Sequence, residues 1–163
     1  YKRQAMGLAL PFALGLAAVQ PDQRVVVVEG DGGLLMHMGA LATVGAVAPQ
    51  NLTIMLMQNG VHEASGGQPL TNKELDFSKL AQSLGIGQAR TVDTVGEFGV
   101  VLRGALTRPG PEFIAASVDI DLHVVRPPEP FNPVVTKVRF SRAIDAPRYI
   151  PTTFGGGGME SGD

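Results

Sequence analysis

The chain of 163 residues contains no cysteine, which excludes disulfide bonds and thiolate metal centres and makes a cytoplasmic enzyme the expected class. Its most apolar segment, residues 6–19, is interrupted by Gly7, Pro11 and Gly15 and falls short of the ~20 residues of a membrane span. Lysine and arginine are scattered and the net charge is −2, so the basic patch of a nucleic-acid-binding protein is also absent. We therefore expect neither a membrane nor a nucleic acid among its partners.

What the sequence does contain is the composition of a folded domain. Hydrophobic residues make up 44% of the chain and charged residues 17%, a balance that supports one core of ordinary size. The chain begins at Tyr1, already inside a patterned segment, and we expect further residues upstream in the natural protein.

Helix-like and strand-like patterns alternate through the first two thirds of the chain. Residues 24–29 contain four consecutive valines, which is typical of a central strand covered on both faces of a parallel sheet. Asp76 is expected to cap a helix. The alternation predicts an α/β fold, a doubly wound parallel sheet with helices on both faces. The expected helices cover residues 8–19, 34–48, 76–84 and 96–107, and the expected strands lie within residues 24–29, 51–58, 85–92 and 111–118.

The character of the chain changes after Asp121. Residues 126–133 are rich in proline, which suits neither the interior of a helix nor a central strand. We therefore predict three parts: a domain over residues 1–121, an extended arm over residues 122–154 and a glycine-rich flexible tail over residues 155–163.

A glycine-rich turn, Gly30-Asp31-Gly32-Gly33, follows the strand of valines. Glycines let a backbone approach a phosphate closely, and the free amides of a following helix favour an anion. Asp31 would repel that phosphate unless a divalent cation lay between them, and Mg²⁺ prefers hard oxygen ligands. The turn alone is equally compatible with an ordinary tight turn.

A second polar loop begins at Asn59, 28 positions after Asp31, at the end of the next expected strand. Carboxyl ends of neighbouring parallel strands form the ligand-binding edge of such sheets, so the amide oxygen of Asn59 is a candidate neutral ligand for the same cation.

Together these features resemble the cofactor-binding motif of thiamine-diphosphate-dependent enzymes, a GDG followed after a similar spacer by Asn. The segment Met6-Gly7-Leu8-Ala9-Leu10-Pro11-Phe12-Ala13-Leu14-Gly15 resembles the family's sequence before that motif. The loop Asn59-Gly60-Val61-His62-Glu63-Ala64-Ser65-Gly66-Gly67-Gln68-Pro69 is similar to that of sulfopyruvate and phosphonopyruvate decarboxylases. The resemblance runs from about Met6 to Asp119.

The resemblance implies thiamine diphosphate and Mg²⁺ as cofactors, held by the family's diphosphate-binding (PP) domain. It implies that Met6 wedges the cofactor into its bent form and that the carbonyl of Gln4 accepts a hydrogen bond from the cofactor's amino group; from its position alone, Met6 could equally be a core methionine. The implied magnesium ligands are the side chains of Asp31 and Asn59 and the carbonyl of Val61, and the implied diphosphate contacts are Gly30, Gly32 and Gly33.

The family's catalytic glutamate belongs to a separate pyrimidine-binding (Pyr) domain, which no part of these 163 residues resembles; it lies either upstream of Tyr1, if the sequence is a fragment, or on a second subunit. The resemblance therefore implies the small, beta-type subunit of a hetero-oligomer whose active site is shared with a Pyr-domain, alpha-type subunit. The implied reaction is non-oxidative decarboxylation of a small 2-oxo acid to an aldehyde through an enamine intermediate.

Several side chains in the second loop are candidates for substrate contact. His62 is the candidate proton donor or anion contact, because histidine titrates near neutrality; it could instead be a loop histidine bonded to a carbonyl. Glu63 is expected to be a solvated or interface charge, and Ser65 and Gln68 either contact substrate or hold the loop. His37 is expected at a packing or subunit interface.

Two other functions stay open on the residues alone. An acetolactate-synthase-like carboligase would join the same intermediate to a second carbonyl compound, and a non-catalytic module would hold only Mg²⁺ and a diphosphate. A nicotinamide-binding domain is disfavoured, because the turn at Gly30 lacks the GxGxxG spacing.

Overall fold

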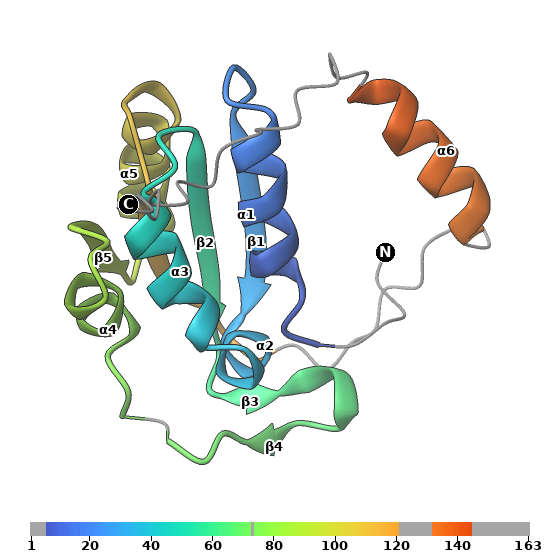
Figure 1. Cartoon of the computed structure of the whole chain (residues 1–163). Coiled ribbons are helices and arrows are strands. Elements are labelled where there is room, and N and C mark those ends of the chain that lie inside the picture. Colours follow the sequence, from blue (N-terminus) through green and yellow to red (C-terminus); the bar gives the residue numbers. More distant parts are fainter. Residues whose placement is uncertain (1–5, 73, 121–131, 145–163) are drawn as a thin grey trace, which may run out of the picture. The chain divides into compact units, whose positions relative to one another are not determined.

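The computed structural model describes residues 6–72, 74–120 and 132–144, and the chain divides into two compact units, Tyr1–Glu129 and Pro130–Asp163. The first unit is built on a parallel sheet with the strand order β1-β2-β6-β5 (Figure 1). Every neighbouring pair in this sheet is parallel. The strands are β1 (Val25–Gly30), β2 (Leu52–Gln58), β5 (Gln88–Val92) and β6 (Glu112–Ser117).

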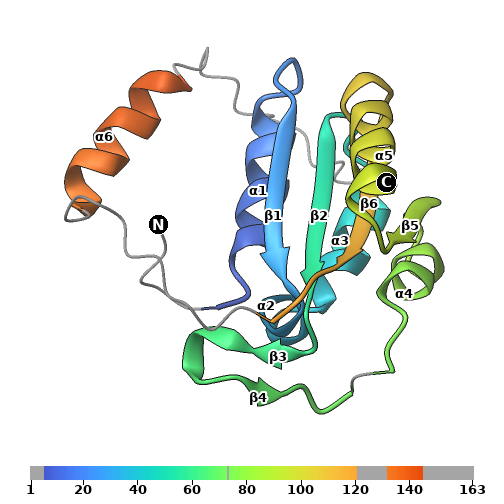
Figure 2. The same ribbon diagram turned by 180° about the vertical axis from the view of Figure 1, so that it is seen from behind.

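Helices pack on both faces of the sheet, which confirms the predicted α/β class. Helices α1 (Ala9–Val19) and α3 (Gly39–Val47) cover one face, seen in front of β1 and β2 in Figure 1. Helix α4 (Phe77–Ser83) contributes to the same core, whereas α5 (Val95–Thr107) lies on the opposite face (Figure 2). The larger core includes Leu10, Leu41, Ile54, Phe77 and Phe113, and the smaller one under α5 includes Val92, Ala105, Ile114 and Ala116.

The prediction of a central strand at the four valines was wrong, because β1 lies at an edge of the sheet and pairs only with β2 among the described residues. Val25 and Val27 face the core, but Val26 and Val28 are 41% and 56% exposed. The reason is that α5 packs on β6 and does not extend over β1.

The predicted helix over residues 34–48 is two helices. A short helix α2 (Asp31–Met36) starts within the glycine-rich turn itself, and α3 begins at Gly39 after a break at His37. Helix α4 begins where expected, with the Asp76 carboxylate accepting a hydrogen bond from the amide of Lys79. The other predicted helices and strands agree with the structure to within a few residues.

The loop after β2 is more ordered than its glycines suggested. It forms a small hairpin of β3 (Val61–His62) and β4 (Gln68–Pro69), linked through a 3₁₀ turn at Glu63–Ser65. Gly30 at the end of β1 is paired with Met57 near the end of β2, so the turn and the hairpin both leave the carboxyl end of the sheet. The candidate site lies at this carboxyl end.

In the second unit, α6 (Pro133–Ala143) is a helix where the sequence predicted an extended arm. The Asn132 carboxamide oxygen accepts hydrogen bonds from the amides of Val134 and Val135, and Pro133 occupies the first helical turn, where its missing N–H costs nothing. The remaining residues assigned to the arm and the tail lie outside the described part of the chain. No helix of the described residues is long and apolar enough to cross a membrane.

Candidate functional site

Asp31 joins the two loops that leave the carboxyl end of the sheet. Its carboxylate is buried, and Oδ1 accepts a hydrogen bond from the amide of Gly32 at 2.8 Å. Oδ2 accepts one from the amide of Gly60, in the loop after β2, at 2.7 Å. Both donors are neutral backbone amides, so neither brings a positive charge to the carboxylate, and its oxygens retain lone pairs for a cation.

Asn59 is fixed at both ends of its carboxamide. Its Oδ1 accepts a hydrogen bond from the amide of Val61 at 3.1 Å, and its Nδ2 donates one to Oε2 of Glu63 at 3.0 Å. Because Gly60 follows Asn59 directly and bonds to Asp31, the structure brings together the two loops that the sequence singled out.

His62 lies against the glycine-rich turn. A β-carbon placed on Gly32 would stand 2.5 Å from Nδ1 of His62 and 3.4 Å from the Leu70 side chain. A β-carbon on Gly33 would collide with the carboxylate of Glu29. A larger residue at either position would therefore push the His62 or Glu29 side chain aside, a constraint that the sequence did not reveal.

The first residue of the turn is different, because a β-carbon on Gly30 would meet no atom within 4 Å. Open space on this side of the turn is what a ligand lying against the backbone requires. Gly30 thus marks the accessible side of the turn, whereas Gly32 and Gly33 mark its packed side.

Gly7 lies against α2 and the residue that follows it, His37. Gly7 has a φ of +84°, and a β-carbon there would stand 2.9 Å from the carbonyl oxygen of Gly33. Met6 is 38% exposed, so it is not a plain core methionine. The segment before the motif therefore reaches the glycine-rich turn, while Gln4 lies outside the described residues.

The oxygen atoms of this site suit a hard cation. Among residues 6–72, 74–120 and 132–144, no three histidine, aspartate or glutamate side chains gather as a metal-binding group. The site offers one carboxylate from Asp31, one amide oxygen from Asn59 and backbone carbonyls. A Mg²⁺ that takes its remaining ligands from a diphosphate and water matches this donor set, because Mg²⁺ usually binds with only one or two carboxylates.

The other candidate residues fall into two groups. The Ser65 hydroxyl lies 3.1 Å from Oε1 of Gln68, and Nε2 of Gln68 donates to the Ser65 carbonyl, so these two side chains hold the hairpin together. His37 is an exposed residue that ends α2. The sequence analysis did not predict the hydrogen bond between Asn59 and Glu63, although the two residues are only four positions apart in one loop. It also did not predict that Glu29, beside the turn, is buried.

Comparison with known proteins defines the class of this fold and site. Residues 3–116 match the model of the thiamine pyrophosphate enzyme, C-terminal TPP-binding domain. The chain therefore belongs to the thiamine pyrophosphate enzyme family.

The relatives are decarboxylases of two kinds and a synthase. The chain is 40% identical over 70% of its length to a phosphonopyruvate decarboxylase of Streptomyces hygroscopicus, of which it covers 28%. It is 31% identical over 88% of its length to the sulfopyruvate decarboxylase subunit beta of Methanocaldococcus jannaschii, of which it covers 76%. It is 33% identical over 72% of its length to a catabolic acetolactate synthase of Raoultella terrigena, of which it covers 22%.

A solved structure supports the fold. An X-ray structure from Mycobacterium smegmatis, described as that of a thiamin diphosphate-dependent enzyme, superposes with a TM-score of 0.55 at 24% identity. The match covers 70% of this chain and 22% of that one. The chain thus spans less than a third of several relatives and most of a beta subunit.

Proposed function

We propose that this chain is the PP-domain subunit of a thiamine-diphosphate-dependent 2-oxo acid decarboxylase of the sulfopyruvate or phosphonopyruvate type. The observation that carries the proposal is the carboxylate of Asp31, which is buried between the glycine-rich turn and the Asn59 loop and is bonded to both by neutral amides. An uncompensated negative charge at that point favours a cation, and a cation in turn favours a bound diphosphate.

In this proposal the chain supplies the magnesium and diphosphate half of the site. When bound, thiamine diphosphate supplies the electron sink for cleavage of the carbon–carbon bond next to a 2-oxo group. The chain's own residues bind and orient it. Asp31, Asn59 and the carbonyl of Val61 hold Mg²⁺, and the backbone of Gly30, Gly32 and Gly33 holds the diphosphate.

Met6 and Gln4 orient the other end of the cofactor. The exposure of Met6 and the contact of Gly7 with the turn support a role for this segment beside a ligand rather than in the core. We assign Met6 as the apolar wedge and the carbonyl of Gln4 as the acceptor for the cofactor's amino group.

His62 is the proposed catalytic side chain. Its imidazole lies against Gly32, and the residue belongs to β3, whose pairing with Gln68 holds the backbone. We assign the imidazole as a proton donor or as a contact for a substrate anion, because it lies beside the turn that carries the proposed cofactor contacts. The test is the variant His62→Asn. General acid–base catalysis contributes roughly 10²–10⁴-fold to the rate, so kcat should fall at least about tenfold. The affinity for the cofactor should stay within about twofold of the wild type, because His62 is not assigned a cofactor contact. Equal loss in both quantities would assign His62 to packing of the turn.

The proposed active site needs a second chain. Three of the similar proteins are named sulfopyruvate decarboxylase subunit beta, and a beta subunit implies a partner. We assign the missing glutamate to a Pyr-domain alpha subunit, and we propose a cytoplasmic hetero-oligomer that acts on a small 2-oxo acid with a second anionic group.

The second candidate is a carboligase. It is favoured by the 33% identity to an acetolactate synthase over 72% of this chain. The two functions share every residue assigned above, so they are separated by product analysis rather than by mutation of this chain.

Two experiments test the proposal: cofactor binding by the variant Asp31→Ala, and analysis of the products formed from 2-oxo acids. Mg²⁺-dependent binding of thiamine diphosphate, measured by calorimetry on the wild-type chain and on its complex with the alpha subunit, should be lost in the variant while its circular dichroism is retained. Unchanged affinity would overturn the assignment of the site. Release of CO₂ and an aldehyde from a panel of 2-oxo acids supports the decarboxylase, and an acetolactate-type product supports the carboligase.

A further inference from the structure

The carboxamide of Asn59 has two ends of nearly the same shape and opposite chemistry. Its oxygen can bind a cation, whereas its NH₂ group would repel one. In this structure the amide of Val61 bonds to the oxygen, and Oε2 of Glu63 accepts a hydrogen bond from Nδ2 at 3.0 Å. A carboxylate can only accept, so the contact with Glu63 is possible in one orientation of the carboxamide and not in the other.

Glu63 is itself held in place by the hairpin. It begins the 3₁₀ turn that ends at Gly66, which has a φ of +113° and donates its amide hydrogen to the Glu63 carbonyl. The amide of Gly67 bonds to the carbonyl of His62, and the amide of Leu70 bonds back to the carbonyl of Gly60 at 2.9 Å. These bonds close the hairpin immediately after Asn59. The carboxylate therefore approaches Asn59 from a fixed backbone.

We propose that Glu63 is a positioning residue for the metal: it binds the NH₂ end of Asn59 and so directs Oδ1 toward Mg²⁺. The inference rests on the proposed function, because it assumes that Asn59 is a magnesium ligand. Glu63 is not a ligand in this account. It acts through Asn59, as the outer partners of metal ligands do when they fix orientation.

Orientation and charge are separable by substitution. Glu63→Gln removes the charge but keeps an oxygen that accepts from Nδ2 at the same reach. Glu63→Asp keeps the charge but shortens the side chain by one carbon, which breaks a 3.0 Å contact. If orientation is what matters, Glu63→Gln keeps the Mg²⁺ affinity within about threefold, and Glu63→Asp and Glu63→Ala each lose about tenfold, the lower end of the roughly 10- to 100-fold typical of outer partners.

The measurement is a calorimetric titration of Mg²⁺ into the full chain with its alpha subunit, in excess thiamine diphosphate. Glu74→Ala, at an exposed carboxylate, is the matched control and should match the wild type. The NMR signal of the Asn59 side-chain NH₂ provides a readout without cofactor, and it should shift in Glu63→Asp and not in Glu63→Gln.

Each outcome decides a separate question. A tenfold loss in Glu63→Gln with affinity retained in Glu63→Asp would mean that the charge acts and would overturn the orienting role. Full affinity in Glu63→Asp and Glu63→Ala would also overturn it, while loss of binding in Asp31→Ala would still support the metal site. Unchanged binding in the Asp31→Ala variant would instead remove the proposed function on which this inference rests.

Discussion

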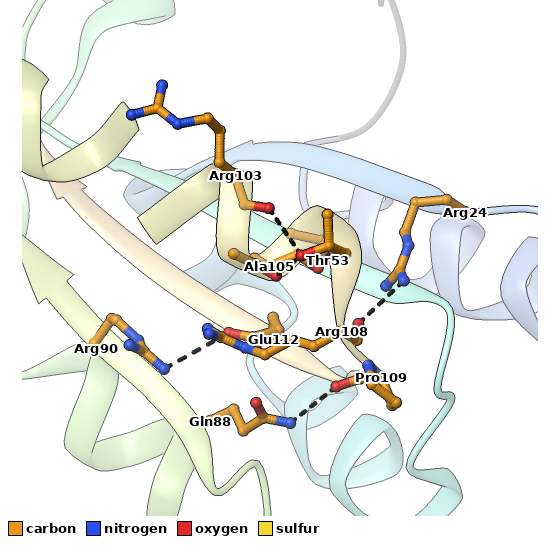
Figure 3. Close-up of polar contacts among 11 residues, drawn as sticks. Arg24, Thr53, Gln88, Arg90, Arg103, Ala105, Arg108, Pro109 and Glu112 are labelled. Carbon is orange, nitrogen blue, oxygen red and sulfur yellow. Dashed lines mark hydrogen bonds and ion pairs between the residues drawn. The ribbon is translucent and has the colours of Figure 1, made fainter. Parts of the chain in front are cut away.

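Two buried carboxylates lie at opposite ends of the parallel sheet. Asp31 follows β1 at the carboxyl end, and Glu112 begins β6 at the amino end. The side chain of Glu112 is completely buried, and it pairs with Nε of Arg108 and, at 3.9 Å, with Nη2 of Arg90 (Figure 3). Asp31 has only neutral amide partners among the described residues.

The difference lies in what the partners do to the charge. Two guanidinium groups neutralise Glu112, and in return the carboxylate raises the pKa of Arg108 above its ordinary value, chiefly through their hydrogen bond. The amides around Asp31 stabilise its charge without cancelling it. A neutralised carboxylate holds the fold, whereas a charge left uncompensated is available to a ligand.

The largest expected effect on cofactor affinity comes from removing the charge of Asp31, at the carboxyl end of the sheet. Asp31→Asn keeps the shape of the side chain and one acceptor oxygen, so we expect only about 1–2 kcal/mol less stability from the weakened amide bonds. Mg²⁺-dependent affinity for thiamine diphosphate should fall by at least about 100-fold, beyond the roughly 10- to 100-fold typical of outer partners, because the charged oxygen ligand becomes a neutral amide. Calorimetry and urea unfolding of the same samples measure both. Retained affinity together with lost stability would place Asp31 in the same class as Glu112.

The matched change at the amino end should show the opposite pattern. Glu112→Ala leaves two guanidinium groups without their partner, and we expect the free energy of unfolding to fall by about 2 kcal/mol. This is less than for a fully buried pair, because Arg90 and Arg108 are 41% and 39% exposed and can turn toward water. Urea unfolding measures the loss. Cofactor affinity should stay within about twofold, and a larger change would mean that the two ends of the sheet are coupled.

A substitution in the packed part of the turn should have a smaller effect on binding. Gly32→Ala would put a β-carbon 2.5 Å from Nδ1 of His62, so the imidazole must move away from the turn. Overpacking of this kind typically costs about 1–3 kcal/mol, so we expect the displaced imidazole and turn to lower the cofactor affinity about tenfold. The double variant Gly32→Ala/His62→Ala removes the collision and should recover most of the affinity. Failure to recover it would show that the turn tolerates no β-carbon even when His62 is absent.

Much of this organisation was predictable from the sequence, because its signals are local. The alternating apolar segments gave the α/β class, and Asp76 marked the start of its helix. The spacing of Asp31 and Asn59 placed both at the ends of neighbouring strands, which made their proximity predictable. Each inference needed only periodicity, a capping residue or the geometry of a parallel sheet.

The features that escaped prediction depend on contacts between distant segments. Four valines cannot reveal that β1 lies at an edge, because that depends on which helix covers which strand. The collision that a β-carbon on Gly32 would have with His62 joins residues 30 positions apart. The start of α6 is a local exception: the prediction of an extended arm counted Asn132-Pro133 against a helix, whereas these residues cap and begin one.

A third carboxylate, that of Asp76, accepts a hydrogen bond from an amide without being buried, so it shows the effect of such a bond alone. Of the substitutions considered, its removal should have the smallest effect on stability and on cofactor binding. Asp76 caps α4 and accepts hydrogen bonds from the Lys79 amide and the Ser78 hydroxyl, as Asp31 does from amides, but its side chain is 38% exposed whereas Asp31 is buried. The hydrogen bond from the Lys79 amide, followed by those from the Lys79 and Ser78 side chains, holds the pKa of Asp76 well below its usual range.

A lowered pKa means that the folded state binds a proton less readily than the unfolded state, so Asp76 stabilises the fold above the ordinary aspartate pKa of about 4 and loses this effect as the pH falls below it. Asp76→Ala should therefore lower the melting temperature by a few degrees at pH 7 and progressively less toward pH 2, as measured by calorimetry. Cofactor affinity at pH 7 should not change. If Asp76→Ala were equally destabilising at both pH values, the contribution of the cap would not depend on its charge.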